Sequence, residues 1–184
     1  MDNNILITLE RLMLRPIQLA DSASIFIYRS NSTVNQFQGW IPKTVDDVHD
    51  FITDRTSPEI NVPGSWFQFA IVKKEINEII GDVGVHFSDS DEFQVELGIS
   101  LSQIHQGKGF ATEALIGVIN YLFNRMHKNR ITASIDPRNQ KSIQLFERLG
   151  FRKEAHFKQR YFINGEWVDD LVYAILKDEW ETGN

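Results

Sequence analysis

The sequence contains no cysteine, and this absence excludes several kinds of chemistry. Without a thiol there is no disulfide, no thiolate metal site and no cysteine nucleophile. No apolar run approaches the length of a membrane-spanning helix. The stretch from Met1 to Leu14 lacks the basic region, apolar run and small-residue site of a secretory leader. We therefore expect a cytoplasmic protein that does not enter a membrane.

The chain also lacks excess positive charge and clustered metal ligands. Its formal net charge of −6 disfavours non-specific binding to nucleic acid and suits a cationic substrate. The 5 histidines are scattered without the spacing of metal ligands, so we expect no metal site. The 184 residues contain no repeat or linker and can bury a core without disulfides, which predicts a single domain over residues 1–184.

Hydrophobic periodicity in the first half predicts alternating strands and helices. We expect a strand over 5–14, a helix capped by Asp21 that runs to about Arg29, a loop over 30–45 and a short helix over 46–53. Strands over 66–73, 78–87 and 93–101 then follow closely. The short polar turns between these strands favour an antiparallel meander.

The second half predicts how the sheet is completed. A long amphipathic helix over 110–127 leads to a short strand over 131–135 and a helix over 139–149. Strands over 152–163 and 167–176 flank Asn164-Gly165, a strong hairpin-turn signal. The strand-helix-strand unit in the middle implies one parallel pairing. The expected class is α+β (mixed α/β), with a central, mostly antiparallel sheet and helices on both faces.

Gly107 and Gly109 mark the loop between the third meander strand and the long helix. Glycine lets the backbone approach a ligand, and the first turn of a helix presents unpaired N–H groups at the positive end of its dipole. Together they form a cradle for an anion such as phosphate. The dinucleotide fingerprint needs a further glycine where Thr112 stands, and the nucleoside-triphosphate motif is absent. Taken alone, the two glycines are better explained as a tight turn.

A second motif changes this interpretation. The loop reads Gln-x-x-Gly-x-Ala over Gln106–Ala111, and Asn-Gln-Lys-Ser-Ile-Gln-Leu-Phe-Glu-Arg-Leu-Gly-Phe follows over Asn139–Phe151. Both segments resemble those of the GNAT superfamily of acetyl-CoA-dependent N-acetyltransferases. The opening segment Thr8–Pro16 and the closing segment Asn164–Trp180 resemble the RimJ/RimL-like branch. The resemblance covers nearly the whole chain, with its segments in the right order.

The resemblance implies acetyl-CoA as co-substrate and a set of residues that hold it. Backbone N–H groups of the loop would bind the pyrophosphate, and the preceding strand would pair with the pantetheine arm. Asn139 would hydrogen-bond that arm, and it could also cap its own helix. The expected coenzyme A-binding residues are Ile99, Leu101, Gln106, Gly107, Lys108, Gly109, Phe110, Ala111, Thr112, Asn139, Ser142 and Phe146.

Glu96 and Ser142 are the expected catalytic residues. The family often places a glutamate on the strand of Glu96 to receive the amine proton, and partial burial would raise its pKa into a useful range. The alternative is a solvated or ion-paired strand residue. Phe146 stands where the family often has a tyrosine acid, and phenylalanine has no proton to give. Ser142 lies one helical turn earlier and could protonate the thiolate, although it could equally be a packing residue, with solvent as the proton source.

The amine acceptor is expected among residues outside these motifs. Aromatic loop residues, including Phe37, could form the walls of a cleft. Asp82 and His86 are reserve candidates for the base, and Asp170 could face the amine or simply orient the closing hairpin. The expected acceptor-binding residues are Trp40, Trp66, His86, Tyr161 and Asp170.

These expectations describe an N-acetyltransferase that moves an acetyl group from acetyl-CoA to a primary amine by direct attack on the thioester. The acceptor would be a protein N-terminus or a small molecule, and the enzyme would be a monomer or homodimer. The alternative is a non-catalytic acyl-CoA-binding or sensing module, which the missing tyrosine leaves open.

Overall fold

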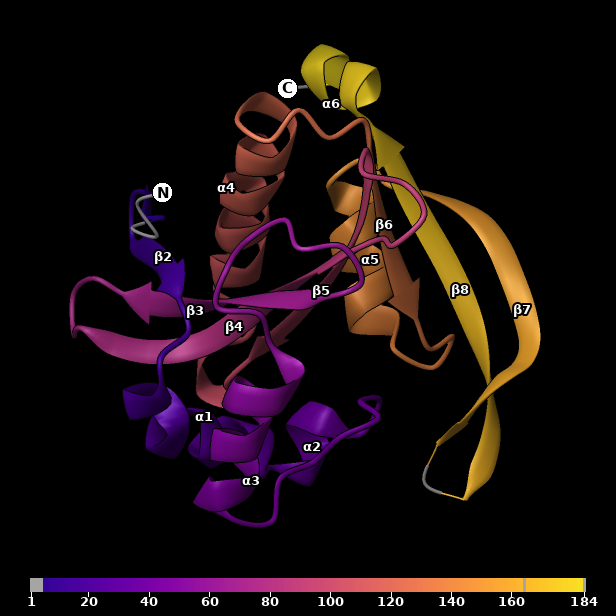
Figure 1. Ribbon diagram of the computed structural model, residues 1–184. Coiled ribbons are helices and arrows are strands. Elements are labelled where there is room, and N and C mark those ends of the chain that lie inside the picture. Colours follow the sequence, from indigo (N-terminus) through magenta and orange to yellow (C-terminus); the bar gives the residue numbers. More distant parts are fainter. Residues whose placement is uncertain (1–4, 164, 184) are drawn as a thin grey trace.

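The computed structural model describes residues 5–163 and 165–183, and its strands form one sheet (Figure 1). The strands are β1 (Ile7–Thr8), β2 (Leu12–Pro16), β3 (Trp66–Lys73), β4 (Glu78–Phe87), β5 (Gln94–Leu101), β6 (Arg130–Ile135), β7 (Arg152–Ile163) and β8 (Glu166–Leu176). Their order across the sheet is β1-β2-β3-β4-β5-β6-β8-β7. Only β5 and β6 pair in parallel, as the strand-helix-strand unit predicted.

Helices cover both faces of this sheet, which confirms the expected α+β class. They are α1 (Ser22–Arg29), α2 (Ser32–Asn35), α3 (Val45–Asp50), α4 (Phe110–Asn124), α5 (Gln140–Arg148) and α6 (Lys177–Gly183). The apolar sides of α4 and α5 join the main core, whereas α1 and α3 form a smaller apolar cluster. In Figure 1, α1, α2 and α3 gather below β3 and β4, and α4 stands above them.

The alternation of side chains along β3, β4 and β5 gives the sheet two unlike faces. One face presents Phe67, Phe69, Val83, Val85 and Leu97, all buried in the main core with α4. The opposite face carries three rows of register partners. These rows are Trp66–His86–Glu96, Gln68–Gly84–Gly98 and Ala70–Asp82–Ser100. Polar side chains and glycines therefore meet on a single face of the sheet, which is the face toward α1 and α3.

The parallel pair β5–β6 is joined over only a short length. Its register pairs are Gln94↔Arg130, Val95↔Ile131 and Glu96↔Thr132. Beyond Glu96, β5 continues to Leu101 without pairing to β6. The backbone edge of β5 from Leu97 onward is therefore left without a strand partner on the β6 side, directly before the glycine loop.

Several element boundaries differ from the sequence-based prediction. The single strand expected over 5–14 is two short strands, because the chain turns back between Leu9 and Leu12 with a 2.9 Å backbone hydrogen bond. The expected loop over 30–45 contains the short helix α2. Helix α3 begins after Thr44, whose hydroxyl caps it, and continues as a π-helical turn over Phe51–Arg55.

Other differences concern caps and chain ends. Asp21 does precede α1, but its carboxylate binds Arg15 rather than capping the helix. Helix α4 ends at Asn124, and His127 takes a left-handed conformation with φ of 54°, so the predicted extension to 127 is wrong. Helix α6 was not predicted as a helix. Strands β7 and β8 pair as expected, but Asn164 of their predicted turn lies outside the described residues.

Candidate functional site

The glycine loop has a conformation that other residues adopt only with strain. Gly107 has φ of 73° and Gly109 has φ of 82°, and Gly109 occupies the N-cap position of α4. Glycine at the N-cap has no side chain to bond the first N–H groups of the helix, so they remain directed at the loop surface. A Cβ at Gly107 would meet no atom of the described chain within 4 Å, so the cradle is open. Phosphate fits a site of this kind.

Residues distant in the sequence hold this loop in place. Nη1 of Arg11 donates to the Lys108 carbonyl at 3.0 Å, and its Nε donates to Glu113 Oε2 at 2.6 Å. Glu113 Oε1 also accepts from the backbone N–H groups of Arg11 and Leu12. Sequence reasoning missed this clamp, because its partners lie 97 to 102 residues apart and neither belongs to a motif that requires the other.

Gln106 connects the loop to the preceding strand. Its Nε2 donates to the Leu101 carbonyl at 3.0 Å, which occupies one lone pair of that carbonyl. The Lys141 ammonium contacts Gln106 Oε1 at 3.4 Å, so the start of α5 also approaches the loop. The expected coenzyme A-binding groups of the loop, β5 and the beginning of α5 therefore lie together in space.

The residues of the second motif take different positions on α5. The Asn139 side chain accepts from the Ser142 backbone N–H at 3.2 Å, so it caps the helix. The Ser142 side chain is half-buried. The Phe146 ring is 3% exposed and packs edge-to-face on Phe151 with centroids 5.0 Å apart. Phe146 is thus a core residue here, and only Asn139 and Ser142 of this group remain partly accessible.

Glu96 lies on the polar face of the sheet, between His86 of β4 and Thr132 of β6. Burial raises the pKa of Glu96 above its ordinary value of 4.5; the nearby His86 opposes this rise and the Asp170 carboxylate adds to it. A half-buried carboxylate with a raised pKa is suited to accept a proton near neutral pH. His86 packs against Trp66 with ring centroids 5.0 Å apart.

Two glycines open a hollow one register row from Glu96, although Glu96 itself is not among the residues that line it. Gly84 and Gly98 are direct register partners in the middle of the polar face. A Cβ at Gly98 would meet nothing within 4 Å in the described chain, whereas one at Gly84 would lie 2.8 Å from Gln68 Nε2. The missing side chains leave a cavity of about 750 Å³ that also reaches Ile99 at the unpaired edge of β5. The hollow therefore adjoins the strand expected to bind pantetheine.

Aromatic and acidic residues surround this cavity. Trp40 and Trp66 both line it, and Trp40 also packs against the smaller apolar cluster and stacks on Phe51 at 4.6 Å. Asp50 and Asp54 line it from α3 and the following π-helical turn. Sequence reasoning missed these two carboxylates, since on a helical segment they are typical of an ordinary solvated face.

Asp82, the reserve base, is already bonded. It is 2% exposed and accepts from the Tyr28 hydroxyl and from Arg29, whose Nε lies 3.1 Å away. Burial, followed by the charge of Asp82, raises the pKa of Tyr28 well above its ordinary value, so the phenol stays protonated and donates. A carboxylate held by these two donors forms part of the cavity wall and is not free to remove a proton.

Four residues expected near the acceptor lie outside this cavity. One of them is His86, which packs against Trp66 instead. Tyr161 is exposed on β7 with Arg160 over its ring, and it does not line the cavity in the described structure. Asp170 is 2% exposed and accepts from Ser134 Oγ and Arg160 Nη1, each at 2.6 Å, which fits its alternative role of orienting the closing hairpin. Phe37 contacts Arg138 instead of the cavity wall.

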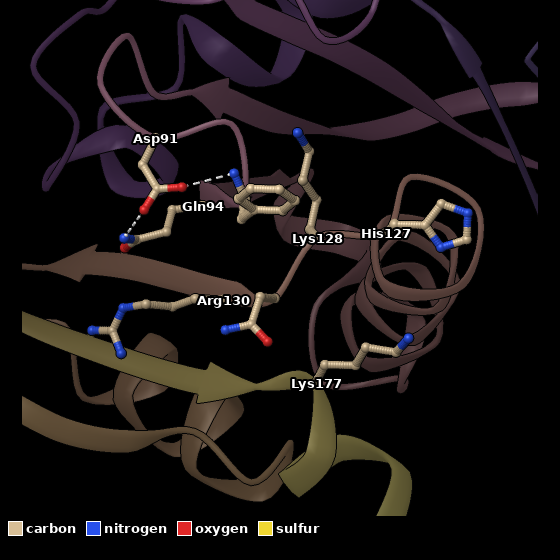
Figure 2. A pocket seen from close by; sticks show the side chains of 8 residues that line it. Asp91, Gln94, His127, Lys128, Arg130 and Lys177 are labelled. Carbon is tan, nitrogen blue, oxygen red and sulfur yellow. Dashed lines mark hydrogen bonds between the residues drawn. The ribbon is translucent and has the colours of Figure 1, made fainter.

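A second cavity of about 540 Å³ lies at the beginning of β5 and β6 (Figure 2). Asp91 there bonds Gln94 Nε2 at 2.6 Å. Figure 2 shows the side chains of Lys128, Arg130 and Lys177 pointing in different directions rather than toward a common centre. Lys128 donates to Asn61 and to the Glu92 carbonyl, and Arg130 pairs with Glu154. Lys177 lies 3.7 Å from Glu181, so each of these three cations already has a partner within the protein.

Across residues 5–163 and 165–183, no three His, Asp or Glu side chains come together as a group that could hold a metal ion. None of the helices in the described part of the chain has both the length and the apolar character needed to span a membrane.

Comparison with known proteins agrees with this geometry. Residues 11–152 match the family model described as the acetyltransferase (GNAT) domain. The chain is 33% identical over 172 residues to the uncharacterized N-acetyltransferase p20 of Bacillus licheniformis, covering 93% of this chain and 96% of that protein. It is 36% identical over 126 residues to the ribosomal protein uS5-alanine N-acetyltransferase of Escherichia coli (strain K12), covering 68% and 65%.

A solved structure extends the agreement to the fold. The crystal structure of a GNAT-family acetyltransferase from Bacillus anthracis matches with a TM-score of 0.83 at 27% identity, covering 95% of this chain and 99% of that one. The chain is an acyltransferase and belongs to the GNAT family of acetyltransferases.

Proposed function

We propose that this protein transfers an acetyl group from acetyl-CoA to a primary amine by direct attack of the amine on the thioester. The proposal rests on how the hollow, the edge of β5 and the glycine loop adjoin one another. The hollow at Gly84 and Gly98 meets the unpaired edge of β5, and that edge leads directly into the open glycine cradle at α4. An elongated phosphate-bearing ligand on the edge would thus reach an acceptor in the hollow.

The residues that would hold coenzyme A divide by the part of the ligand they contact. The N–H groups of Gly107 to Thr112 would bind the pyrophosphate, with Arg11 and Glu113 fixing the loop in shape. The backbone of Ile99 and Leu101 would pair with the pantetheine arm as an added strand would. Acetyl-CoA supplies an activated thioester carbonyl and a thiolate leaving group. Positioning the two reactants accounts for much of the rate of such a reaction.

Glu96 would accept the proton that the attacking amine loses, directly or through one water. Its side chain lies on the same face as the hollow, one register row from Gly98. The raised pKa increases the basicity of the carboxylate and so improves it as a proton acceptor. His86, its register partner, would help to orient it, while Asp82 stays bonded to Arg29.

Ser142 is the proposed donor of the proton that the departing thiolate takes up. It is the partly accessible hydroxyl on α5, whereas Phe146 has no proton and is buried in the core. Ser142→Ala tests this role directly. A lower kcat at unchanged acetyl-CoA affinity would support it, and an unchanged kcat would assign the proton to solvent.

The central experiment combines binding with turnover. Acetyl-CoA at a hundred times its Kd should stabilise the protein by about 2.7 kcal/mol, seen as a raised Tm. Free-thiol release is then measured across a panel of amines that includes N-terminal peptides, with Glu96→Gln compared with the control Glu78→Gln, an exposed glutamate at the beginning of β4. No rise in Tm would contradict coenzyme A binding. A rise without thiol release on any amine would favour the non-catalytic binding module.

A further inference from the structure

Ser134 and Asp170 form a hydrogen-bonded pair that lies outside both sequence motifs. Ser134 is an exposed residue of β6, and its Oγ lies 2.6 Å from Asp170 Oδ1 on β8. Asp170 is 2% exposed, and Arg160 Nη1 donates to its other carboxylate oxygen at 2.6 Å. A buried, ion-paired carboxylate thus holds a hydroxyl that solvent and ligands can reach.

The charge of Asp170 decides the direction of this hydrogen bond. A carboxylate that is paired with a guanidinium can only accept, so the serine must donate. A hydroxyl has one proton and two lone pairs, and no other residue of the described chain bonds this hydroxyl. Ser134 therefore has lone pairs left for a ligand and no proton left to give. Only a ligand group that itself donates a hydrogen bond can use it.

Ser134 lies where β5 and β6 separate. Thr132, two residues earlier on β6, forms the last register pair with β5, and its partner there is Glu96. If the parallel pairing continued, Ser134 would stand opposite Gly98, which lines the acceptor hollow. Ser134 does not line the hollow itself. It stands across from the unpaired edge of β5, beside the strand expected to bind pantetheine.

The side chain of Ser134 also belongs to the polar face of the sheet. The alternate residues of β6 lie in the main core, and they are Ile131, Ala133 and Ile135. Thr132 and Ser134 therefore point to the other face, where Thr132 pairs with Glu96. Burial raises the pKa of Glu96 most, and the Asp170 carboxylate adds to this rise while Arg160 opposes it. The cluster that holds Ser134 is thus close enough to act on the expected base.

Two parts of the ligands carry N–H groups, namely the acceptor amine and the amides of the pantetheine arm. The expected path of the arm follows Ile99 and Leu101 toward the glycine loop, away from the last β5–β6 pair at Glu96. The amine, in contrast, has to approach Glu96 to lose its proton. The position of Ser134 therefore favours the amine as the donor.

We propose that Ser134 positions the acceptor amine, with its Oγ accepting a hydrogen bond from one N–H of the attacking nitrogen while Glu96 takes another proton. Asp170 and Arg160 are positioning residues, because they turn the serine proton away from the amine. This inference rests on the proposed function, since it takes Glu96 as the base. An amine has enough N–H groups for both partners, whereas an alcohol has a single O–H and satisfies only one of them.

Two substitutions of the serine test the contact. Ser134→Ala and Ser134→Thr are compared with the parent by thiol release from acetyl-CoA, with butylamine and an Ala-Gln peptide as acceptors. Loss of one hydrogen bond should lower kcat/KM roughly tenfold in the alanine variant, and the threonine hydroxyl should restore it. Acetyl-CoA should raise Tm equally in all three proteins. A smaller rise in Ser134→Ala would assign the hydroxyl to the coenzyme, and an unchanged kcat/KM would show no contact; either result would overturn the proposal.

Neighbouring carboxylates on β8 test the positioning role. Asp170→Asn places an amide that can donate to Ser134, so we expect kcat/KM to fall roughly tenfold through the KM for the amine. Asp169→Asn is the matched control, since Asp169 also holds β7, through Lys158 and Gln159, but does not bond Ser134. Equal losses in the two variants would reduce the network to a brace of the hairpin.

A double variant separates action through Ser134 from a direct effect. In the Ser134→Ala background, Asp170→Asn should have a much smaller effect on kcat/KM than in the parent, because the residue that it positions is gone. Losses that simply add would contradict the assignment of Asp170 as a positioning residue.

A binding readout separates this inference from the proposed function. Calorimetric titration of the protein–coenzyme A complex with butylamine and with Ala-Gln does not require turnover. If neither amine is acetylated but Ser134→Ala weakens the binding of one of them roughly tenfold, the Ser134 contact stands while the proposed function fails. If the parent binds neither amine, or the variant binds both as the parent does, the inference is wrong.

Discussion

The two faces of β3, β4 and β5 come from alternate residues of the same strands, yet their surroundings have almost nothing in common. One face buries Phe67, Phe69 and Val85 against α4 in the main core. On the other, Gln68 has an unpartnered oxygen and Gly98 leaves open space. Neighbours along one strand thus serve different purposes: one side stabilises the sheet and the other forms the site.

The site can be rigid because its side chains belong to the same strands as the packed apolar face. The polar groups are attached to a backbone that the apolar face fixes against α4, so the hollow is positioned without a core of its own. A shift of register by one residue would exchange the two faces completely. The comparison predicts that substitutions on the apolar face change stability, whereas substitutions on the polar face change activity.

Phe69→Ala should have the largest effect. Phe69 is fully buried, with its ring packed edge-to-face on Phe67 at 4.9 Å. Deleting such a ring leaves a cavity and typically lowers the free energy of unfolding by about 3–5 kcal/mol. Urea denaturation followed by tryptophan fluorescence measures the loss. If Phe69→Ala keeps the stability of the parent but loses turnover, the assignment of stability to the apolar face and activity to the polar face is wrong.

Glu96→Gln should lower activity without lowering stability. Removing a general base lowers kcat by about 100-fold or more. Because the folded-state pKa of Glu96 is raised, this carboxyl destabilises the fold as pH rises from 4.5 through that pKa, and the effect is complete above it. The amide lacks this penalty, so Glu96→Gln should be at least as stable as the parent at pH 7. A clear fall in the urea midpoint would instead make Glu96 a structural residue.

Gly98→Val sharpens the comparison by adding an apolar side chain to the polar face. The new Cβ meets no atom of the described chain within 4 Å, so the fold should tolerate it. The side chain would enter the acceptor hollow, and we expect kcat/KM for the amine to fall about tenfold while acetyl-CoA still raises Tm. Gly84→Val is the contrast, since its Cβ would lie 2.8 Å from Gln68 and should also cost stability.

The pH profile should show the smallest effect. Because Glu96 must be ionised to accept a proton, kcat/KM should rise with pH through an apparent pKa above 4.5. The Glu96→Gln variant should lack this limb of the profile. An acid limb that persists unchanged in the variant would point to another base on the same face.

The sequence anticipated those parts of the site that depend on local pattern. Alternation around Glu96 predicted a side chain opposite Val95 and Leu97, and the structure has it on that face. The glycines of the loop predicted a tight turn, and Gly107 and Gly109 take the positive φ that glycine adopts easily in such a turn. Strand periodicity and backbone sterics are encoded within a few neighbouring residues, so one sequence is enough to read them.

Contacts between distant segments were not predictable in this way. Asp82 was a plausible base until the fold paired it with Arg29, and Tyr161 was a plausible acceptor contact until the hairpin carried it away from the hollow. Gln68, Asp50 and Asp54 belong to no motif, and each looks like an ordinary polar residue in the sequence. The structure brings all three to the lining of one cavity.

By itself, the sequence determined the α+β class, the parallel pairing and the glycine turn before α4, because hydrophobic period and glycine geometry act locally. Only the tertiary structure decided which face of the sheet is hollow, that Arg11 and Glu113 brace the loop, and that Phe146 lies in the core. These outcomes depend on how segments far apart in the chain pack together, and residue spacing alone does not specify that packing.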